Sequence, residues 1–137
     1  MSLRVVIVDD EPLARERVRT FLTDEPDVEI VAECDDGAEA VNRIEVLRPD
    51  VLFLDVQMPK LNGFEVLEAI DPAAMPAVIF TTAYDDHAIR AFEVSAVDYL
   101  LKPFTQARFR KALERARAQL RAAKAGTTDP QISKLLS

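Results

Sequence analysis

A length of 137 residues fits one domain with one hydrophobic core, and 49% hydrophobic with 30% charged residues is ordinary for a globular protein. Cys34 and His87 are the only cysteine and histidine, which excludes a disulfide framework, a Cys/His zinc site and a Ser-His-Asp site that needs more than one candidate base. The net charge of −7 arises in residues 1–105, which sum to −13, whereas residues 106–125 sum to +6. Because an acidic body repels nucleic acid, the chain alone is a poor DNA binder.

Short apolar runs alternate with helical patterns along the first half of the chain. The run 5–8 is β-branched throughout, which is typical of a strand buried on both faces, and Pro12 after three acidic residues indicates the start of a helix. Further strands are predicted over residues 28–32 and 51–54, and helices over residues 38–47 and 63–70, the last with Phe64 and Leu67 turned inward.

The second half continues the alternation. Residues 77–80 and 97–101 are predicted strands, and residues 87–94 form a helix that Asp85 or Asp86 can cap. A long helix over residues 105–123 carries the apolar stripe Phe109, Leu113, Ala116 and Leu120, with basic residues elsewhere that are expected to be solvated or, alternatively, to form a docking face. Gly126 ends this pattern.

Five strands joined by helices predict an α/β three-layer sandwich, in which a parallel sheet has helices on both faces. No apolar run exceeds four residues and the first residues do not resemble a signal peptide, so we expect a cytoplasmic protein that does not enter a membrane.

Polar side chains gather where the predicted strands end. Asp9, Asp10 and Glu11 follow the first strand, Asp55 the third, Thr82 the fourth and Lys102 the fifth. Ligands of open α/β sheets bind beyond the carboxyl ends of the strands. Crowded carboxylates repel one another unless a cation joins them, and Mg²⁺ prefers oxygen ligands of this kind. Together with a hydroxyl and a lysine, they predict a site for phosphoryl chemistry.

Four segments in this order resemble the receiver domain of bacterial two-component response regulators, a CheY-like family. They are Val8-Asp9-Asp10, the run from Leu54-Asp55 to Asn62-Gly63, Thr81-Thr82-Ala83, and Lys102-Pro103-Phe104. The resemblance covers residues 3 to about 122. It implies a flavodoxin-like (βα)5 fold with strand order 2-1-3-4-5, a receiver domain over residues 1–124, and a linker or tail over residues 125–137 towards an output domain.

The resemblance implies a role for each site residue. Asp55 would accept a phosphoryl group from a phosphohistidine of a sensor histidine kinase. Asp10 would bind Mg²⁺ directly and Asp9 partly through water, joined by Asp55 and the backbone carbonyl of Gln57. The domain would be no enzyme beyond catalysing its own phosphorylation and slow dephosphorylation.

Three further positions complete the implied switch. Lys102 would pair with the phosphoryl oxygens, and its bond to Pro103 would be cis. Thr82 would donate to a phosphoryl oxygen, and Tyr99 would then turn inward, although plain packing is an equally open interpretation of this tyrosine.

A finer resemblance concerns output and assembly. Residues 82–92 and 98–104 are similar to the LytR/AlgR branch, whose output is a LytTR-type DNA-binding domain, so transcription control would run through a domain outside this chain. Receivers commonly dimerise on activation through the fourth helix, fifth strand and fifth helix. The interface candidates there are Phe92, Ala96, Phe109 and Leu113.

Three other functions are open to a fold of this class. A phosphatase with an aspartate nucleophile needs a second Asp two residues later as general acid, and that position is Gln57. A flavodoxin-like nucleotide-binding protein needs a glycine-rich first loop, which residues 9–12 do not offer. A stand-alone receiver, or a pseudo-receiver that binds protein partners without phosphorylation, remains the main alternative, although such a module is expected to lose part of the acidic cluster or Lys102.

Overall fold

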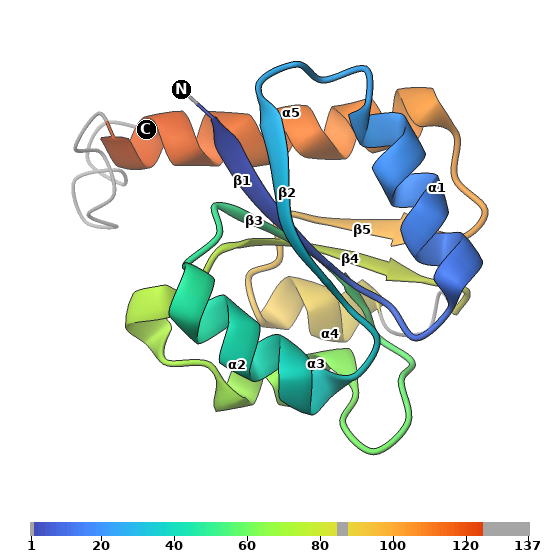
Figure 1. Ribbon diagram of the computed structural model, residues 1–137, viewed down its shortest axis with the longest axis vertical. Helices are drawn as coiled ribbons and strands as arrows, with labels where there is room; N and C mark the ends of the chain where they lie inside the picture. Colours follow the sequence, from blue (N-terminus) through green and yellow to red (C-terminus); the bar gives the residue numbers. More distant parts are fainter. Residues whose placement is uncertain (1, 85–87, 125–137) are drawn as a thin grey trace.

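A computed structural model of the chain describes residues 2–84 and 88–124. Within them, strands and helices alternate as in Figure 1: β1 (Leu3–Val8), α1 (Pro12–Leu22), β2 (Val28–Cys34), α2 (Gly37–Leu47), β3 (Val51–Asp55), α3 (Gly63–Ala69), the 3-10 turn η1 (Pro72–Ala74), β4 (Ala77–Thr82), α4 (Ala88–Glu93), β5 (Asp98–Leu101) and α5 (Gln106–Lys124). None of the helices in this described part is long and apolar enough to cross a membrane.

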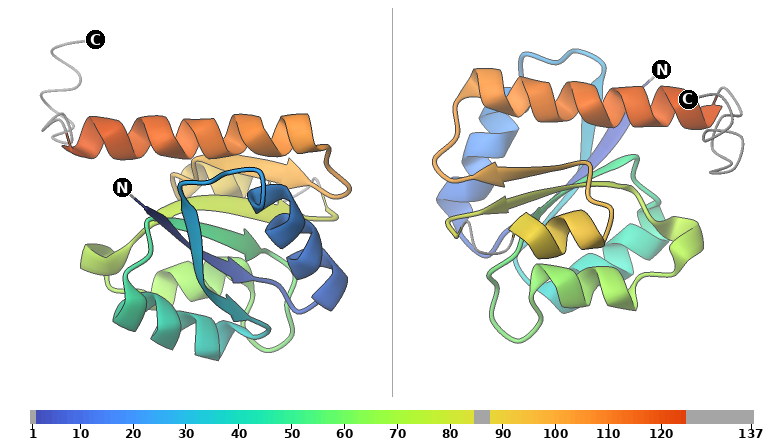
Figure 2. Two further views of the ribbon diagram at one scale, coloured as in Figure 1. Left: turned by 45° about the horizontal axis from the view of Figure 1, so that its top comes forward. Right: turned by 180° about the vertical axis from the view of Figure 1, so that it is seen from behind.

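The five described strands form one parallel sheet in the order β2-β1-β3-β4-β5, which confirms the predicted fold class and strand order. Helices α1 and α5 cover one face, and α2, α3 and α4 cover the other, as both views of Figure 2 show. Neighbouring strands that are not consecutive in the chain, such as β1 and β3, bring distant residues to the same edge.

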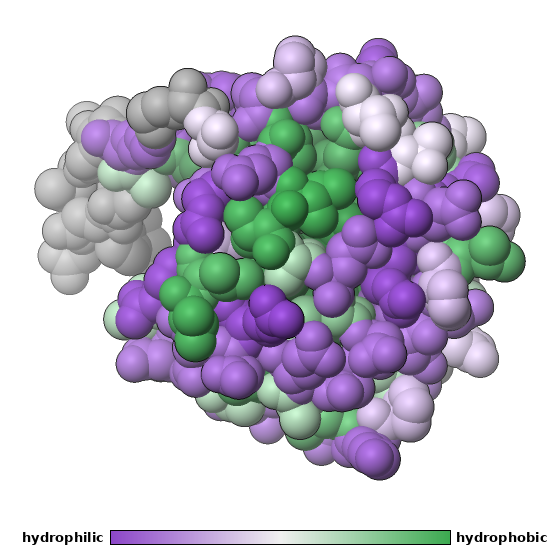
Figure 3. Space-filling view, viewed as in Figure 1, coloured by the Kyte–Doolittle hydropathy of each residue, from purple (hydrophilic) through white to green (hydrophobic). Residues whose placement is uncertain are grey.

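The central strands are apolar because both of their faces are covered. In β1, Val6 and Val8 pack into the cluster beneath α2, α3 and α4, whereas Val5 and Ile7 pack into the cluster beneath α1 and α5. The edge strand β2 is only half-buried, and Figure 3, which looks onto it, shows an apolar strip there between hydrophilic surroundings. The continuous apolar runs of the sequence are therefore explained by two core layers.

Local signals set the helix starts. The Asp36 side chain accepts the Glu39 N–H at the start of α2, and Asn62 and Glu65 form a reciprocal capping box at the start of α3. By contrast, the Glu11 side chain makes no capping hydrogen bond at the start of α1, where Pro12 occupies the first turn.

Two interface candidates were wrong. Phe109 and Leu113 are fully buried against the sheet, where Phe109 stacks on Phe53 with 5.1 Å between ring centroids. They cannot meet another molecule without unpacking the core. Ala96 is half-buried in the segment between α4 and β5. The Phe92 side chain lies outside the described residues, as do Asp85, Asp86, His87 and residues 125–137.

Other differences are confined to element ends and to one helix face. Strand β2 continues to Cys34, and β5 begins one residue later than expected, at Asp98. In α1, Val18 and Leu22 are buried as its pattern suggests, but Leu13 is 79% exposed. The inward positions Phe64 and Leu67 of α3 are confirmed.

Candidate functional site

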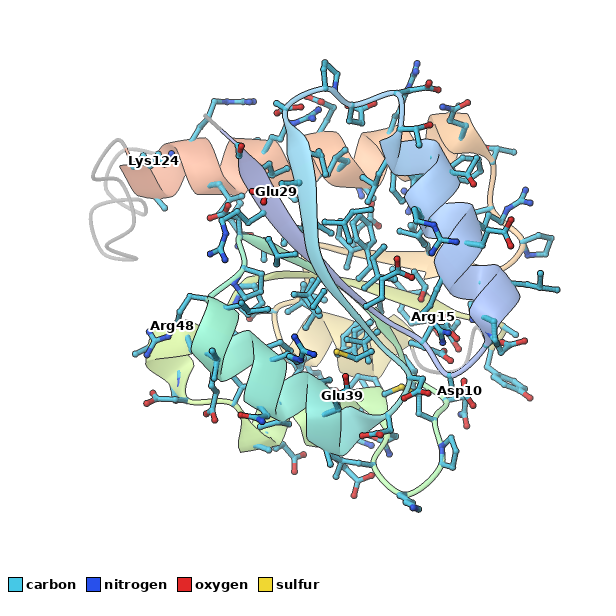
Figure 4. The ribbon with its side chains drawn as sticks, viewed as in Figure 1. Asp10, Arg15, Glu29, Glu39, Arg48 and Lys124 are labelled. Carbon is cyan, nitrogen blue, oxygen red and sulfur yellow. The ribbon has the colours of Figure 1, made fainter. Side chains whose placement is uncertain are left out.

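Four carboxylates meet at the carboxyl edge of the sheet. Asp9, Asp10 and Glu11 follow β1, and Asp55 ends the neighbouring strand β3; one oxygen of each lies within 4.8 Å of the others. Asp9 and Asp55 are each only 3% exposed. Figure 4 shows Asp10 at this edge, beside the first turn of α1. The predicted gathering of these carboxylates at one rim is therefore present.

Lys102 supplies positive charge to this cluster from the end of β5. Its Nζ lies 2.8 Å from Asp9 Oδ2, 3.3 Å from Glu11 Oε1 and 3.8 Å from Asp55 Oδ2. Burial alone would lower the pKa of Lys102, but the hydrogen bond that it donates to Asp9 and the charges of Asp55 and Asp9 raise it above its ordinary value. The ammonium group therefore stays charged. The Lys102–Pro103 peptide bond is cis, as expected.

The surroundings of Asp55 raise the pKa of its carboxyl group. Burial and the charge of Asp9 raise its pKa to about 7, against the opposing effects of Lys102 and of the Gln57 N–H, which donates to Asp55 Oδ1 at 3.2 Å. One ammonium group does not balance the carboxylates around it. The cluster therefore favours an added cation.

The donors of this cluster fit Mg²⁺. Carboxylate oxygens on two adjacent strand ends are hard ligands at a spacing that one ion can bridge, and Mg²⁺ is commonly held by one or two carboxylates together with waters. Its charge would also relieve the repulsion that raises the Asp55 pKa. That Asp9, Asp10, Asp55 and the Gln57 carbonyl are the ligands remains a prediction.

A close backbone approach fixes the position of Asp55. The Gly63 N–H donates to the carbonyl of Val56 at 3.0 Å, and a Cβ at position 63 would lie only 2.6 Å from the Asp55 carbonyl oxygen. Glycine is needed here because any side chain would push the end of β3. Sequence reasoning placed Gly63 at the start of a predicted helix but gave it no structural role, and the Asn-Gly pair at that helix start was the available signal.

The two predicted switch residues meet at one neighbour. Thr82 is fully buried at the end of β4, and its hydroxyl oxygen accepts the N–H of Tyr84 at 3.3 Å. Tyr99 is half-buried on β5, and its hydroxyl donates to the carbonyl of Tyr84. Thr82 and Tyr99 are therefore linked through the backbone of Tyr84, a residue to which sequence reasoning gave no role.

Two more side chains reach the site although no role was predicted for them. Glu11 contacts Lys102, and the Arg15 Nη1 donates to the backbone carbonyl of Asp9 at 2.6 Å. Arg15 offered a weak signal, because a basic residue in the first turns of a helix opposes the helix dipole and needs another reason to be there.

A groove of about 510 Å³ opens beside this site. Its walls are α1 and the segment that follows β5, and its lining includes Asp9, Lys102, the exposed Leu13, Phe21 and Phe104. The lining is mostly apolar and includes two charged groups of the site, Asp9 and Lys102.

Comparisons with known proteins agree with this geometry. The response regulator receiver domain family matches residues 5–114. The chain is 51% identical over 117 residues to the transcriptional regulatory protein BtsR of Escherichia coli (strain K12), covering 85% of this chain and 49% of that protein. It is 54% identical over 113 residues to an uncharacterized response regulatory protein of Yersinia pestis, covering 82% and 48%. The chain thus spans about half the length of the curated relatives it matches.

Solved structures show the same fold. The receiver domain of AraT from Geobacillus stearothermophilus superposes with a TM-score of 0.81 at 34% identity, covering 90% of this chain and 99% of that one. The response regulatory domain of mrkE from Klebsiella pneumoniae gives a TM-score of 0.78 at 33% identity, covering 85% and 96%. With its fold, its acidic edge and these relatives in agreement, the chain belongs to the response regulator receiver domain family.

Proposed function

We propose that this domain is a phosphorylation switch in which Asp55 accepts a phosphoryl group from a phosphohistidine of a sensor histidine kinase. The observation that carries the proposal is the buried Asp55 carboxylate, set among other carboxylates with the Lys102 ammonium 3.8 Å away. A carboxylate oxygen of Asp55 forms the new bond to phosphorus as the bond to the histidine nitrogen breaks. The product is an acyl phosphate on Asp55, and the histidine of the donor regains a proton.

Asp9, Asp10 and Asp55, with the carbonyl of Gln57, would hold Mg²⁺. When bound, the ion neutralises charge on the phosphoryl oxygens. Lys102 pairs with the same oxygens, and its contacts with Asp9 and Asp55 support this role. Gln57 cannot act as a general acid in the position that an aspartate-nucleophile phosphatase fills with Asp, so the group is stored rather than turned over rapidly.

The conformational switch would act through the contacts of Thr82 and Tyr99 with the backbone of Tyr84. Once a phosphoryl oxygen is present, the Thr82 hydroxyl turns to donate to it and gives up the Tyr84 N–H that it now accepts. Tyr99, whose hydroxyl binds the Tyr84 carbonyl, then changes partner and turns inward. This rearrangement alters the surface of α4 and β5 and favours a homodimer on activation.

The proposed output of the switch, control of transcription, is supported by the relatives of this chain. Residues 1–124 would be the receiver and residues 125–137 a linker towards a LytTR-type domain of the LytR/AlgR branch, which would bind DNA and control transcription. Two observations support a role in transcription control: the chain covers 49% of BtsR, which is named a transcriptional regulatory protein, and the receiver family matches only residues 5–114. The LytTR type of the output rests on the resemblance of residues 82–92 and 98–104 alone.

Intact-protein mass after incubation with acetyl phosphate and Mg²⁺ tests the proposal. We expect one phosphoryl adduct on the parent protein, which is absent from Asp55→Asn and absent without Mg²⁺. No adduct on a parent protein that binds Mg²⁺ would contradict the proposal and would leave a pseudo-receiver that acts through protein partners.

A further inference from the structure

Arg15 makes a contact that the phosphorylation mechanism does not use. Its side chain is only 20% exposed on the first turns of α1, and Nη1 donates to the Asp9 carbonyl at 2.6 Å. Figure 4 shows Arg15 and Asp10 at the same end of the molecule. A charged donor on a buried carbonyl is a strong hydrogen bond, and it replaces the strand pairing that β1 can no longer supply there.

The contact bears on the direction of Asp10. The Asp9 carbonyl belongs to the peptide group that joins Asp9 to Asp10, and this group is planar. Because Arg15 holds the carbonyl oxygen, the orientation of the whole peptide group is fixed. This orientation sets the direction in which the Asp10 side chain leaves the backbone. The remaining polar groups of Asp9 are also held: its N–H donates to the Cys34 carbonyl, Oδ1 accepts the Glu11 N–H, and Oδ2 accepts Lys102.

Arg15 is itself held by the edge strand. Its Nε lies 3.8 Å from Glu33 Oε1 on β2, and Arg19, one turn further along α1, binds both oxygens of the same carboxylate at 2.8 and 2.9 Å. Glu33 thus fixes α1 against β2 through two arginines. Only one of the two, Arg15, continues to the backbone between the predicted metal ligands.

We propose that Arg15 is a positioning residue for Mg²⁺, which acts by fixing the Asp9–Asp10 peptide group. This inference rests on the proposed function, because it assumes that Asp9 and Asp10 hold the ion. Groups that orient metal ligands commonly contribute 10- to 100-fold to metal affinity. We therefore expect Arg15→Met to weaken Mg²⁺ binding by about tenfold.

Whether Arg15→Met weakens or strengthens Mg²⁺ binding distinguishes a positioning role of Arg15 from a purely electrostatic one. Removing a positive charge near carboxylates strengthens the binding of a cation, so an electrostatic role for Arg15 predicts tighter binding in Arg15→Met. Arg19→Met is the matched control, since it removes the same charge from the same Glu33 partner without touching Asp9. It should bind Mg²⁺ as well as the parent protein or slightly better.

The experiment is calorimetric titration of Mg²⁺ into the parent protein, Arg15→Met, Arg15→Lys and Arg19→Met, with melting temperatures measured in EDTA. Of the two methionine variants, we expect only Arg15→Met to bind Mg²⁺ more weakly than the parent protein. Arg15→Lys should lose less affinity for Mg²⁺ than Arg15→Met. The melting temperatures of the two methionine variants in EDTA should match. Raising Mg²⁺ to saturation should return the phosphorylation rate of Arg15→Met with acetyl phosphate to the parent value.

Three results would overturn the inference. They are unchanged or tighter binding in Arg15→Met, equal weakening in Arg15→Met and Arg19→Met, and a parent-like affinity in Arg15→Lys if Arg15→Met does not fold. A parent protein that does not bind Mg²⁺ would instead refute the proposed function, and the inference with it, so the two failures are distinguishable.

Discussion

Two aspartates of this domain have similar burial and opposite electrostatic surroundings. Asp55 ends β3, with its side chain 4% exposed, and shares one ammonium group with other carboxylates. Asp98 begins β5, with its side chain 6% exposed, and is bound by two arginines of α5, Arg108 and Arg115. The pKa of Asp55 is raised to about 7 by burial and by Asp9. Burial also opposes ionisation of Asp98, but hydrogen bonds from Arg108 and the Tyr99 N–H outweigh it and lower its pKa.

The two aspartates differ in what their charge does: the charge of Asp55 favours ligand binding, whereas the charge of Asp98 stabilises the fold. At the carboxyl edge of the sheet, like charges are left uncompensated, which costs stability and favours ligands that bring positive charge. At Asp98, the same kind of carboxylate is neutralised within the chain and joins β5 to α5. Much of the basic surface of α5 is accounted for similarly, since Arg117 pairs with Glu25, Asp27 and Glu114. This favours the solvated or structural interpretation of that surface over a docking face.

The largest expected effect comes from removing the ammonium group at the acidic edge. Lys102→Met should reduce the rate of phosphorylation by acetyl phosphate by about 10²- to 10³-fold, because the developing charge on the phosphoryl oxygens loses a placed cation. Lys60→Met, at an exposed position of the loop after β3, is the control and should keep the parent rate. A loss below about tenfold in Lys102→Met would show that the lysine is not part of the phosphoryl site.

Removing one of the crowded carboxylates should stabilise the protein. Because the folded pKa of Asp55 lies above its unfolded value of about 4, its ionised form destabilises the folded state, and this cost grows from about pH 4 to about pH 7. At pH 8 in EDTA, Asp55→Asn should raise the free energy of unfolding by about 2–4 kcal/mol, because a rise of about three pKa units at about 1.4 kcal/mol each sets an upper bound of about 4 kcal/mol. Urea denaturation measures this, and a less stable variant would contradict it.

The same substitution at the other aspartate should have the opposite sign. The lowered pKa of Asp98 means that its ionised form stabilises the folded state above the unfolded pKa of about 4, and that this contribution is lost as the pH falls through the folded pKa. Asp98→Asn should therefore cost about 1–2 kcal/mol at pH 7 and less at pH 3. Denaturation curves at both pH values test this, and a pH-independent cost would point to packing instead.

The smallest expected effect separates the two arginines at Asp98. Arg108 makes two hydrogen bonds to the carboxylate, at 2.7 and 2.8 Å, whereas Arg115 makes one at 3.1 Å and is half-exposed. Arg115→Gln should cost about 0.5 kcal/mol or less, and added salt should remove that cost. Arg108→Gln should cost about 1 kcal/mol because it breaks a bidentate pair. Equal costs in thermal unfolding would mean that the second bond of Arg108 contributes nothing.

Sequence reasoning predicted the parts of this protein that depend on local pattern. The β-branched run of β1, the spacing of Phe109 and Leu113 on α5, and the acidic residues at the strand ends each follow from neighbours in the chain. The same residues also mark where pattern fails. An apolar stripe shows that Phe109 and Leu113 must be covered, but not whether the core or a partner covers them.

Patterns along the chain are therefore enough to predict the order of elements, the fold class and the types of group at the carboxyl edge. Which of these groups touch depends on the packing of the elements. Lys102 and Asp9 meet across 93 residues, and the Arg15 contact with the Asp9 carbonyl depends on how α1 lies over the end of β1. Local patterns specify helices and strands because apolar residues recur with a period of about 3.6 residues in helices and 2 in strands. Contacts between distant residues depend instead on how those elements pack.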